Sequence, residues 1–368
     1  MPKVEYDCDV IIVGAGLSGL ACADLLHATG LKIIVLEAAE QIGGRICSIA
    51  DKGSRHYRAD LGPTWIWPKY QPAIDPWLKR LDIEIFDQYE TGDAILDLQA
   101  HGSVHRQHIP GQDGIARISG GPQILIDRLS SKLETGAIRT AHRVTKIEPH
   151  ETALKLTATD KCLNKHVSLR ARRVLICAPL RIARQTIDWS SELTADVLQE
   201  MNDTPTWMAT QAKAVALYDH PFWRQAGLSG RVASQAGPLT EIHDHSSDDG
   251  TDAALFGFIG WPHQMRKSKK HELIGLINDQ LVRCFGKQAG RHKTLRIKDW
   301  ATCETICSHQ DLTSPPAHPE VISDRLRDPH FDGRLFFCVS ETSTQSPGLI
   351  EGAFTAAQST VTRLIAEI

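Results

Sequence analysis

The chain has 368 residues, 42% of them hydrophobic, and a formal net charge of -3 at pH 7. This length suits two domains, or one domain with a large insertion. Acidic and basic residues are interleaved, and the longest basic run is short, residues 266–270, so nothing suggests a nucleic-acid partner. The apolar run at residues 9–16 is too short for a membrane span or a signal peptide, and the nine cysteines follow no disulfide framework, so we expect a cytoplasmic protein.

The first predicted elements form one βαβ unit. An apolar run at residues 9–13 predicts a buried strand, the pattern at 18–29 predicts a helix, and residues 31–36 predict a second strand. A segment rich in proline and aromatic residues follows at 51–76 and breaks the regular pattern. The later expected elements are a helix at 120–133, a buried strand at 173–179, strands at 213–218 and 254–261, a helix at 271–285, a strand at 334–341 and a final helix that starts around Gly348.

The motif GAGLSG at residues 14–19 lies between the first strand and the first helix. Gly14 suits a tight turn, Gly16 lets the backbone approach a pyrophosphate, and Gly19 permits close packing of the helix on the strand. Free N–H groups and the helix dipole would then hold the phosphates. Glu37, at the end of the second strand, is placed to accept hydrogen bonds from ribose hydroxyls. The motif in this context predicts a dinucleotide site, which both NAD and FAD fit.

A second glycine turn, GGR at residues 43–45, favours one of these cofactors. Arg45 offers a further cation for phosphate, which suits the long FAD molecule better than NAD. With this motif the chain resembles the flavin-containing amine oxidase family (monoamine, polyamine and L-amino-acid oxidases), and the resemblance spans nearly the whole chain. It implies an α/β fold with a Rossmann-type, glutathione-reductase-like FAD-binding domain and a smaller α+β substrate domain that contains a mixed sheet. The FAD-binding domain is expected at residues 1–72, 117–205 and 300–368, and the substrate domain at 73–116 and 206–299.

The resemblance also implies how FAD is bound, without a covalent link. The segment DLGPTWIWP at residues 60–68 resembles the family's stretch beside the flavin ring, although Gly62-Pro63 replaces a pair of glycines and removes one N–H donor. Val144 is expected to meet the adenine and Glu341 the ribityl chain, and Gly348 is expected to let the bare start of the last helix approach the flavin ring. The residues implied to bind FAD are Gly14, Ala15, Gly16, Leu17, Ser18, Gly19, Glu37, Ala38, Gly44, Arg45, Gly62, Pro63, Thr64, Trp65, Val144, Glu341, Gly348, Leu349, Ile350 and Ala353.

Lys213 is the expected catalytic residue. Family members carry a lysine at this spacing before a PFW element, as in KAVALYDHPFWR at residues 213–224, and the resemblance implies that it reaches the flavin N5 atom through a water. A cation there can stabilise the negative charge that forms when electrons pass to oxygen. The alternative interpretation is a lysine on an edge strand that points into solvent.

The substrate side departs from the family pattern, in which two aromatic residues flank the amine. Counted from Trp300, the first aromatic position falls on Gln310, the second on Leu349, and the position that carries a covalent flavin in some members on His309. We therefore expect no aromatic cage and a dissociable FAD. Histidines and cysteines form no closed four-ligand pattern, so no metal site is expected. The expected substrate pocket consists of Trp65, Trp261, Gln310 and Leu349.

The implied function is the oxidation of an amine or amino acid, in which hydride passes from a C–H next to nitrogen to flavin N5 and O2 is reduced to H2O2. Three alternatives stay open: a renalase-like NAD(P)H-oxidising flavoprotein, a relative of desaturases or protoporphyrinogen oxidase, and a non-catalytic flavin-binding protein. The expected partners are a small-molecule substrate and O2, with no nucleic acid and no membrane. The segment 73–117 is short for the family, which leaves room for an oligomer or a partner that covers the site.

Overall fold

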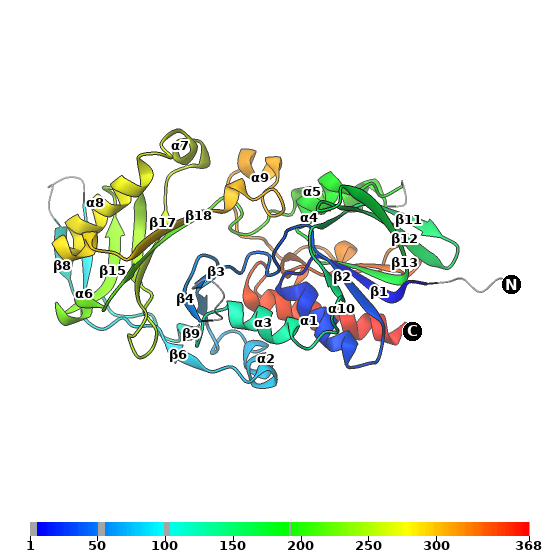
Figure 1. Ribbon diagram of the computed structural model, residues 1–368, viewed down its shortest axis with the longest axis horizontal. Coiled ribbons are helices and arrows are strands. Elements are labelled where there is room, and N and C mark those ends of the chain that lie inside the picture. Colours follow the sequence, from blue (N-terminus) through cyan, green and yellow to red (C-terminus); the bar gives the residue numbers. More distant parts are fainter. Residues whose placement is uncertain (1–5, 51–55, 99–103, 191–192, 368) are drawn as a thin grey trace.

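The computed structural model describes residues 6–50, 56–98, 104–190 and 193–367. Two bodies lie side by side along the long axis of the molecule, each built on its own sheet (Figure 1). One body contains both β1 and the last helix, although they come from opposite parts of the sequence (Figure 1). No helix in the described ranges is long and apolar enough to cross a membrane.

The first body contains β1, α1 and β2, the βαβ unit that carries the dinucleotide motif. Its sheet has the order β10-β2-β1-β13-β12-β11, with β19 also paired to β13. Strands β10, β2, β1, β13 and β19 run parallel, whereas β11 and β12 form antiparallel pairs. The strands are β1 (Cys8–Val13), β2 (Ile33–Leu36), β10 (Ile138–Arg139), β11 (His142–His150), β12 (Ala153–Asp160), β13 (Lys165–Ile176) and β19 (Leu335–Phe337). The parallel part is the doubly covered sheet that a βαβ sequence predicts.

Helices cover both faces of this sheet. Alternate residues of β1 point to opposite faces, so Val10 and Ile12 pack with one group of helices and Ile11 and Val13 with the other. The first group is α1 (Leu17–His27), α2 (Ile74–Leu81), α3 (Gln123–Ser130) and α10 (Ile350–Ala366), and the second is α4 (Leu180–Thr186) and α5 (Ala195–Asp203).

The position of α2 corrects the expected domain boundary at residue 72. Its apolar face, Ile74, Trp77, Leu78 and Leu81, is buried in the core of the cofactor domain. The Trp77 ring stacks on Phe354 of α10, with 4.5 Å between the ring centroids. Residues 74–81 therefore pack with the cofactor domain, because a helix with one apolar stripe must bury it against the nearest core.

The second body, which contains most of the residues expected for the substrate domain, has a mixed sheet. Its order is β18-β14-β17-β16-β15-β7-β8, in which only the β7–β15 pair runs parallel among the described strands. Its elements are β7 (Asp93–Asp97), β8 (Val104–Gln107), β14 (Ala212–Tyr218), β15 (Leu228–Ser234), β16 (Leu239–Asp244), β17 (Ala253–Ile259), β18 (Thr294–Asp299), α6 (Phe222–Gln225), α7 (His263–Ser268) and α8 (Leu273–Phe285). Since β14 lies between β17 and β18, Lys213 does not stand on an edge strand.

Short strands and turns fill the region where the two bodies meet (Figure 1). Strand β3 (Ser48–Ala50) pairs with β4 (Tyr57–Asp60), and β9 (Ala116–Ile118) lies between β5 (Trp65–Ile66) and β6 (Ile85–Asp87). The remaining elements are α9 (His309–Thr313) and 3-10 turns at Lys287–Gly290, Trp300–Thr302, Asp324–Leu326 and Ser340–Thr342. The strand expected at 334–341 is shorter, because the chain turns at Ser340.

Three thiols that are far apart in the sequence meet in the core of the cofactor domain. The sulfurs of Cys22, Cys177 and Cys338 all lie within 4.8 Å of one another, and Cys22 Sγ is 3.3 Å from Cys338 Sγ. Each of the nine cysteines is a free thiol. The trio results from α1 crossing the ends of β13 and β19, which sequence spacing does not predict.

Candidate functional site

A cavity of about 460 Å³ lies between the two bodies. At one end, called here the turn end, it is lined by the turn between β1 and α1, the end of β2 and the glycine turn at 43–44. At the other, called here the lysine end, it is lined by Trp65, Trp67, Met208, Lys213, Phe258, Trp300 and Leu349. All of the residues expected to bind FAD line this cavity except Ala15, Gly19 and Glu341.

The glycines of the first turn have three different surroundings. Gly14 has φ +109°, and a Cβ there would lie 2.9 Å from the carbonyl carbon of Cys177. A Cβ on Gly19 would lie 2.1 Å from the Gly14 oxygen, so this glycine allows α1 to pack on the turn. A Cβ on Gly16 would meet only the Gly44 Cα, at 3.9 Å, and would otherwise project into the cavity. Gly16 and Gly44 thus form a cradle that fits a pyrophosphate against the start of α1.

Glu37 keeps this turn in shape. Its two carboxylate oxygens accept hydrogen bonds from the backbone N–H groups of Ala15, at 2.7 Å, and Ala39, at 2.8 Å. Burial raises the pKa of Glu37, and these hydrogen bonds and the charge of Arg143 oppose the rise. The side chain is buried but still lines the cavity, so it remains within reach of a ribose.

Arg143 is a cavity residue that the sequence reasoning missed. Its Nε and Nη2 atoms are buried and have no hydrogen-bond partner. The nearest carboxylate oxygen paired with it, on the exposed Glu304, is 3.5 Å from Nη2. A guanidinium with two donor atoms free of hydrogen bonds, in the wall beside Val144, fits the phosphates and adenine of FAD, which accept from and stack on such a group. The sequence feature that could have identified Arg143 is its position directly before Val144, the residue expected to meet adenine.

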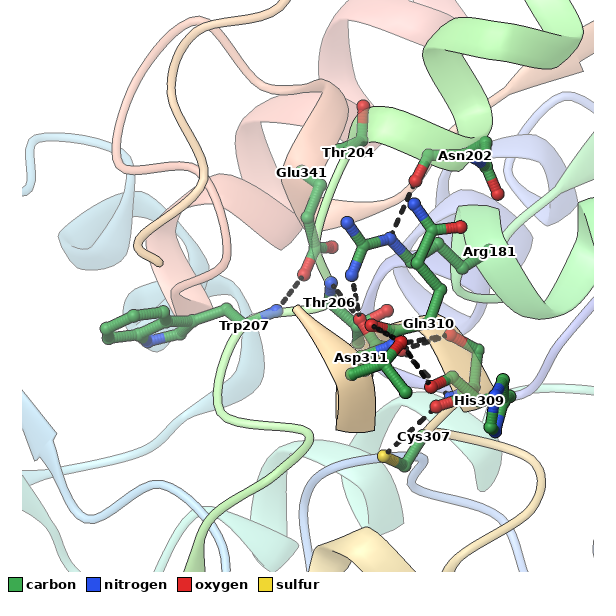
Figure 2. Close-up of polar contacts among 12 residues, drawn as sticks. Arg181, Asn202, Thr204, Thr206, Trp207, Cys307, His309, Gln310, Asp311 and Glu341 are labelled. Carbon is green, nitrogen blue, oxygen red and sulfur yellow. Dashed lines mark hydrogen bonds and ion pairs between the residues drawn. The ribbon is translucent and has the colours of Figure 1, made fainter. Parts of the chain in front are cut away.

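Arg45 and Glu341 form a two-bonded ion pair behind the cavity. Arg45 Nη1 lies 2.7 Å from Glu341 Oε1, and Nη2 lies 2.9 Å from Oε2. Trp207 N–H also donates to Glu341, at 3.1 Å, as Figure 2 shows. Burial alone would raise the pKa of Glu341, but the charge and hydrogen bonds of Arg45, with Ser340 and Trp207, hold it below its usual value. Glu341 does not line the cavity, so in this structure it acts by holding Arg45, which does.

The start of α10 faces the cavity, as expected. Gly348, Leu349, Ile350 and Ala353 all line it, and Leu349 caps the helix without a side-chain hydrogen bond. Free N–H groups and the positive end of the dipole of this long helix therefore lie at the cavity wall. Gly348 also has a second reason to be glycine: its φ is +82°, and a Cβ there would lie 2.6 Å from Trp207 Cβ, so the glycine makes room for Trp207.

Lys213 is buried at the lysine end, with 2% of its surface exposed. Its Nζ donates to Thr64 Oγ1 at 2.5 Å and to the Gly62 carbonyl at 3.1 Å. The same atom lies 4.1 Å from the centroid of the Phe256 ring. Burial lowers the pKa of Lys213 to about 7, with Asp60 opposing this and Arg117 adding to it. The solvent-facing alternative is wrong, and the cation can gain or lose its proton near neutral pH.

A buried polar network supports this lysine and was also missed. The Asp60 N–H donates to His245 Nε2 at 2.8 Å, and Ser48 donates to Asp60 Oδ1 at 2.7 Å. Burial, with the charge of Arg117, lowers the pKa of His245 to about 3, so its ring is neutral. For Asp60, burial acts to raise the pKa, but His245, Lys213 and Arg117 together lower it. Asp60 is thus a buried anion whose charge favours the protonated form of Lys213.

Two of the four expected substrate-pocket residues lie elsewhere. Trp65 and Leu349 line the lysine end, whereas Trp261 packs against the core of the substrate domain. Gln310 lies with His309 beside the Arg181–Asp311 ion pair (Figure 2). Both residues belong to α9 and line a separate surface pocket between α4, α5 and α9. Counting from Trp300 failed because the chain turns within residues 303–308, which brings Thr305 and Ile306 to the cavity instead.

Comparison with known proteins identifies the family and the fold to which this chain is similar. A family model described as flavin containing amine oxidoreductase matches residues 89–365, and one described as an NAD(P)-binding Rossmann-like domain matches residues 12–81. Amine oxidase [flavin-containing] B of Sus scrofa is 23% identical over 95% of this chain and 85% of its own length. The probable flavin-containing monoamine oxidase A of Dictyostelium discoideum is 22% identical over 94% of both chains.

Solved structures share the fold over nearly the whole length. Putrescine oxidase with bound putrescine superposes with a TM-score of 0.77, at 18% identity, over 98% of this chain and 99% of the other. Cyclohexylamine oxidase from Brevibacterium oxydans IH-35A superposes with a TM-score of 0.79, at 21% identity, over the same shares of the two chains, 98% and 99%. At these identities the likeness establishes the fold.

Proposed function

The chain belongs to the flavin-containing amine oxidoreductase family and is an FAD-dependent enzyme, and from this premise we propose that it is an oxidase of small amines that uses O2 as electron acceptor. The observation that carries the proposal is Lys213, a buried cation in the wall of the same cavity that reaches the Gly16–Gly44 cradle. A flavin-binding protein without a reaction would have no need for a buried, partly deprotonated lysine at this place.

FAD, when bound, supplies the two-electron redox chemistry that no side chain can provide. The net reaction converts the amine, O2 and water to an aldehyde or ketone, ammonia and H2O2. The residues that would hold FAD are those of the cradle, Arg45, Arg143 and the start of α10. They offer N–H groups, two guanidinium groups and a helix dipole to an anionic, aromatic molecule.

Lys213 contributes positive charge at the lysine end. Thr64 and the Gly62 carbonyl fix its Nζ, so two of its three N–H directions are occupied. In a buried site such a fixed charge stabilises negative charge that develops on oxygen far better than it would in water. Its pKa of about 7 means that a substantial fraction is protonated at neutral pH.

The aromatic wall positions the substrate and keeps water out. Trp65 donates from Nε1 to Gln88 at 2.8 Å, and Trp300 donates from Nε1 to the Leu61 carbonyl at 3.1 Å. These bonds fix both rings, so the wall is rigid before substrate arrives. Holding the reacting C–H in one orientation, without a strong protein base, is the way in which such a site accelerates the reaction.

An anaerobic panel tests the proposal. The holoenzyme is mixed without O2 with amines, amino acids or NADH, and the visible absorbance of oxidised flavin is followed. We expect amines to bleach the flavin, O2 to restore it with release of H2O2, and NADH to have no effect. Bleaching by NADH alone would reject amine oxidation and favour the NAD(P)H-oxidising alternative.

We also propose that the protein resides in the cytoplasm. The nine free thiols, most of them buried, support a reducing compartment, since secreted domains of this kind pair such residues. Coverage of the site by a second copy or a partner stays a prediction, based on the shortness of the segment 73–117.

A further inference from the structure

We propose that the site accepts amines whose remaining part is uncharged and apolar, and that it discriminates against diamines and against amino acids; this inference rests on the amine oxidase function proposed above. The inference follows from the composition of the lysine end, where the described residues offer apolar surface and one lysine but no carboxylate and no free arginine.

In the described part of the chain, the lysine end has no acid to pair with a second ammonium group. Within the described ranges, Glu37 is the one carboxylate that lines the cavity, and it belongs to the turn end. The carboxylates of Asp60 and Glu341 lie behind the wall, buried and already bonded to Ser48 and Arg45. A diamine would therefore carry a second charge into a desolvated space without a partner, which is strongly unfavourable.

Among the residues that the structure describes, the lysine end also has no free fork of donors for a substrate carboxylate. The guanidinium of Arg45 is bonded to both oxygens of Glu341. Lys213 directs two of its donors to Thr64 and Gly62, so it could give a carboxylate one N–H at most. Recognition of an amino acid normally relies on a two-bonded arginine, which a lysine does not replace.

The wall offers apolar and aromatic surface instead. Phe258 is the register partner of Lys213 on β17, and the Trp65 ring lies 5.3 Å from the Phe256 ring that Lys213 also contacts. Trp67, Met208, Trp300 and Leu349 complete this end. Such a surface stabilises a hydrocarbon tail by excluding water from both sides, and a ring can pack on the indoles edge to face.

Two matched pairs of compounds test the inference on the holoenzyme. Pentan-1-amine and 1,5-diaminopentane differ by one ammonium, and 2-phenylethylamine and phenylalanine differ by one carboxylate. We expect the uncharged-tail member of each pair to have a kcat/KM at least about 100-fold higher, measured as H2O2 release. Equal or better use of 1,5-diaminopentane or phenylalanine would overturn the inference.

A pair of variants at Phe258 tests whether the missing negative charge causes the discrimination against diamines. Phe258→Glu places a carboxylate in the wall, and Phe258→Gln is its uncharged control of similar size. With FAD content and melting temperature confirmed for both, Phe258→Glu should shift the preference toward 1,5-diaminopentane by at least about tenfold relative to Phe258→Gln. An identical preference in the two folded variants would contradict the electrostatic argument.

Measuring how the four compounds bind distinguishes a failure of this inference from a failure of the proposed function. If none of the four compounds is oxidised, amine oxidation fails, and the same pairs are then compared as ligands through perturbation of the flavin spectrum. Tighter binding of the uncharged-tail member in both pairs would support the inference for this pocket, and equal binding would overturn it.

Discussion

Lys213 donates a 2.5 Å hydrogen bond to Thr64, a residue that the chain places directly before the wall residue Trp65. This bond joins β14, an inner strand of the substrate domain, to the loop between β4 and β5. It places a buried cation where both domains contribute to one cavity. The chemistry proposed for the protein depends on this contact.

Replacement of Lys213 by methionine tests its role. Lys213→Met keeps the length of the side chain and removes its charge, so we expect reaction of the reduced enzyme with O2 to slow by at least about 100-fold, with FAD affinity nearly unchanged. Stopped-flow reoxidation measures this rate. Lys293→Met, at an exposed lysine paired with Asp219 in the same domain, is the control and should leave the rate unchanged. A normal rate in Lys213→Met would rule out the electrostatic role.

The lowered pKa of Lys213 predicts a pH dependence. Because burial brings this pKa to about 7, the protonated fraction falls as the pH rises from 6 to 8. The rate of reaction with O2 should fall over the same range in the wild type and stay flat in Lys213→Met. A decrease of equal size in the variant would assign the titration to another group.

Arg143 should contribute to FAD affinity. Arg143→Gln removes the two unpartnered donors from the cavity wall, so we expect the Kd of FAD for the apoprotein to rise about tenfold or more. Titration by flavin fluorescence measures it, and Arg172→Gln, on the exposed side of β13, serves as the control. Similar affinities of the two variants would show that Arg143 does not contact the cofactor.

Substitution of Gly16 and of Gly19 should have different effects, one on FAD binding and the other on stability. Gly16→Ala has room within the protein, so the variant should fold normally and bind FAD at least about tenfold more weakly. Gly19→Ala would place a Cβ 2.1 Å from the Gly14 oxygen, so it should lower the free energy of unfolding by about 3 kcal/mol. Urea unfolding of the two apoproteins measures the loss of stability, and titration with FAD measures the loss of affinity. Normal FAD affinity in Gly16→Ala would contradict the role of the Gly16–Gly44 cradle in binding the pyrophosphate.

The Arg45–Glu341 pair should stabilise the fold in a pH-dependent manner. Since the pKa of Glu341 is lowered, its contribution is present above the ordinary glutamate value of 4.5 and is lost as the pH falls through the folded value. At pH 7, Glu341→Gln should cost about 3 kcal/mol of unfolding free energy because Arg45 loses its buried partner. Glu304→Gln, at an exposed glutamate, should change stability little. Equal effects of the two would reject the role of the pair.

Local patterns predicted much of the fold and the turn end of the cavity. The glycines at 14–19 and the acid at Glu37 are set by backbone conformation within one βαβ unit, so a single stretch of sequence carries the information. Lys213 was predicted from the family resemblance, through the PFW element that follows it.

Contacts between distant segments could not be read in this way. Asp60 and His245 come from different domains, and nothing local indicates that they meet. Gln310 was placed by counting across the turn at residues 303–308, where one change of direction moves a side chain to another pocket. Arg143 becomes informative only when its lack of a partner is seen.

The central claim is that an amine bound at the lysine end passes its electrons to FAD in this cavity. Anaerobic mixing of the holoenzyme with 2-phenylethylamine, followed by O2, tests it most directly. The account predicts complete loss of the oxidised-flavin absorbance before O2 is added, and its return with one H2O2 per flavin. A flavin that stays oxidised with this and every other amine, yet bleaches with NADH, would contradict it.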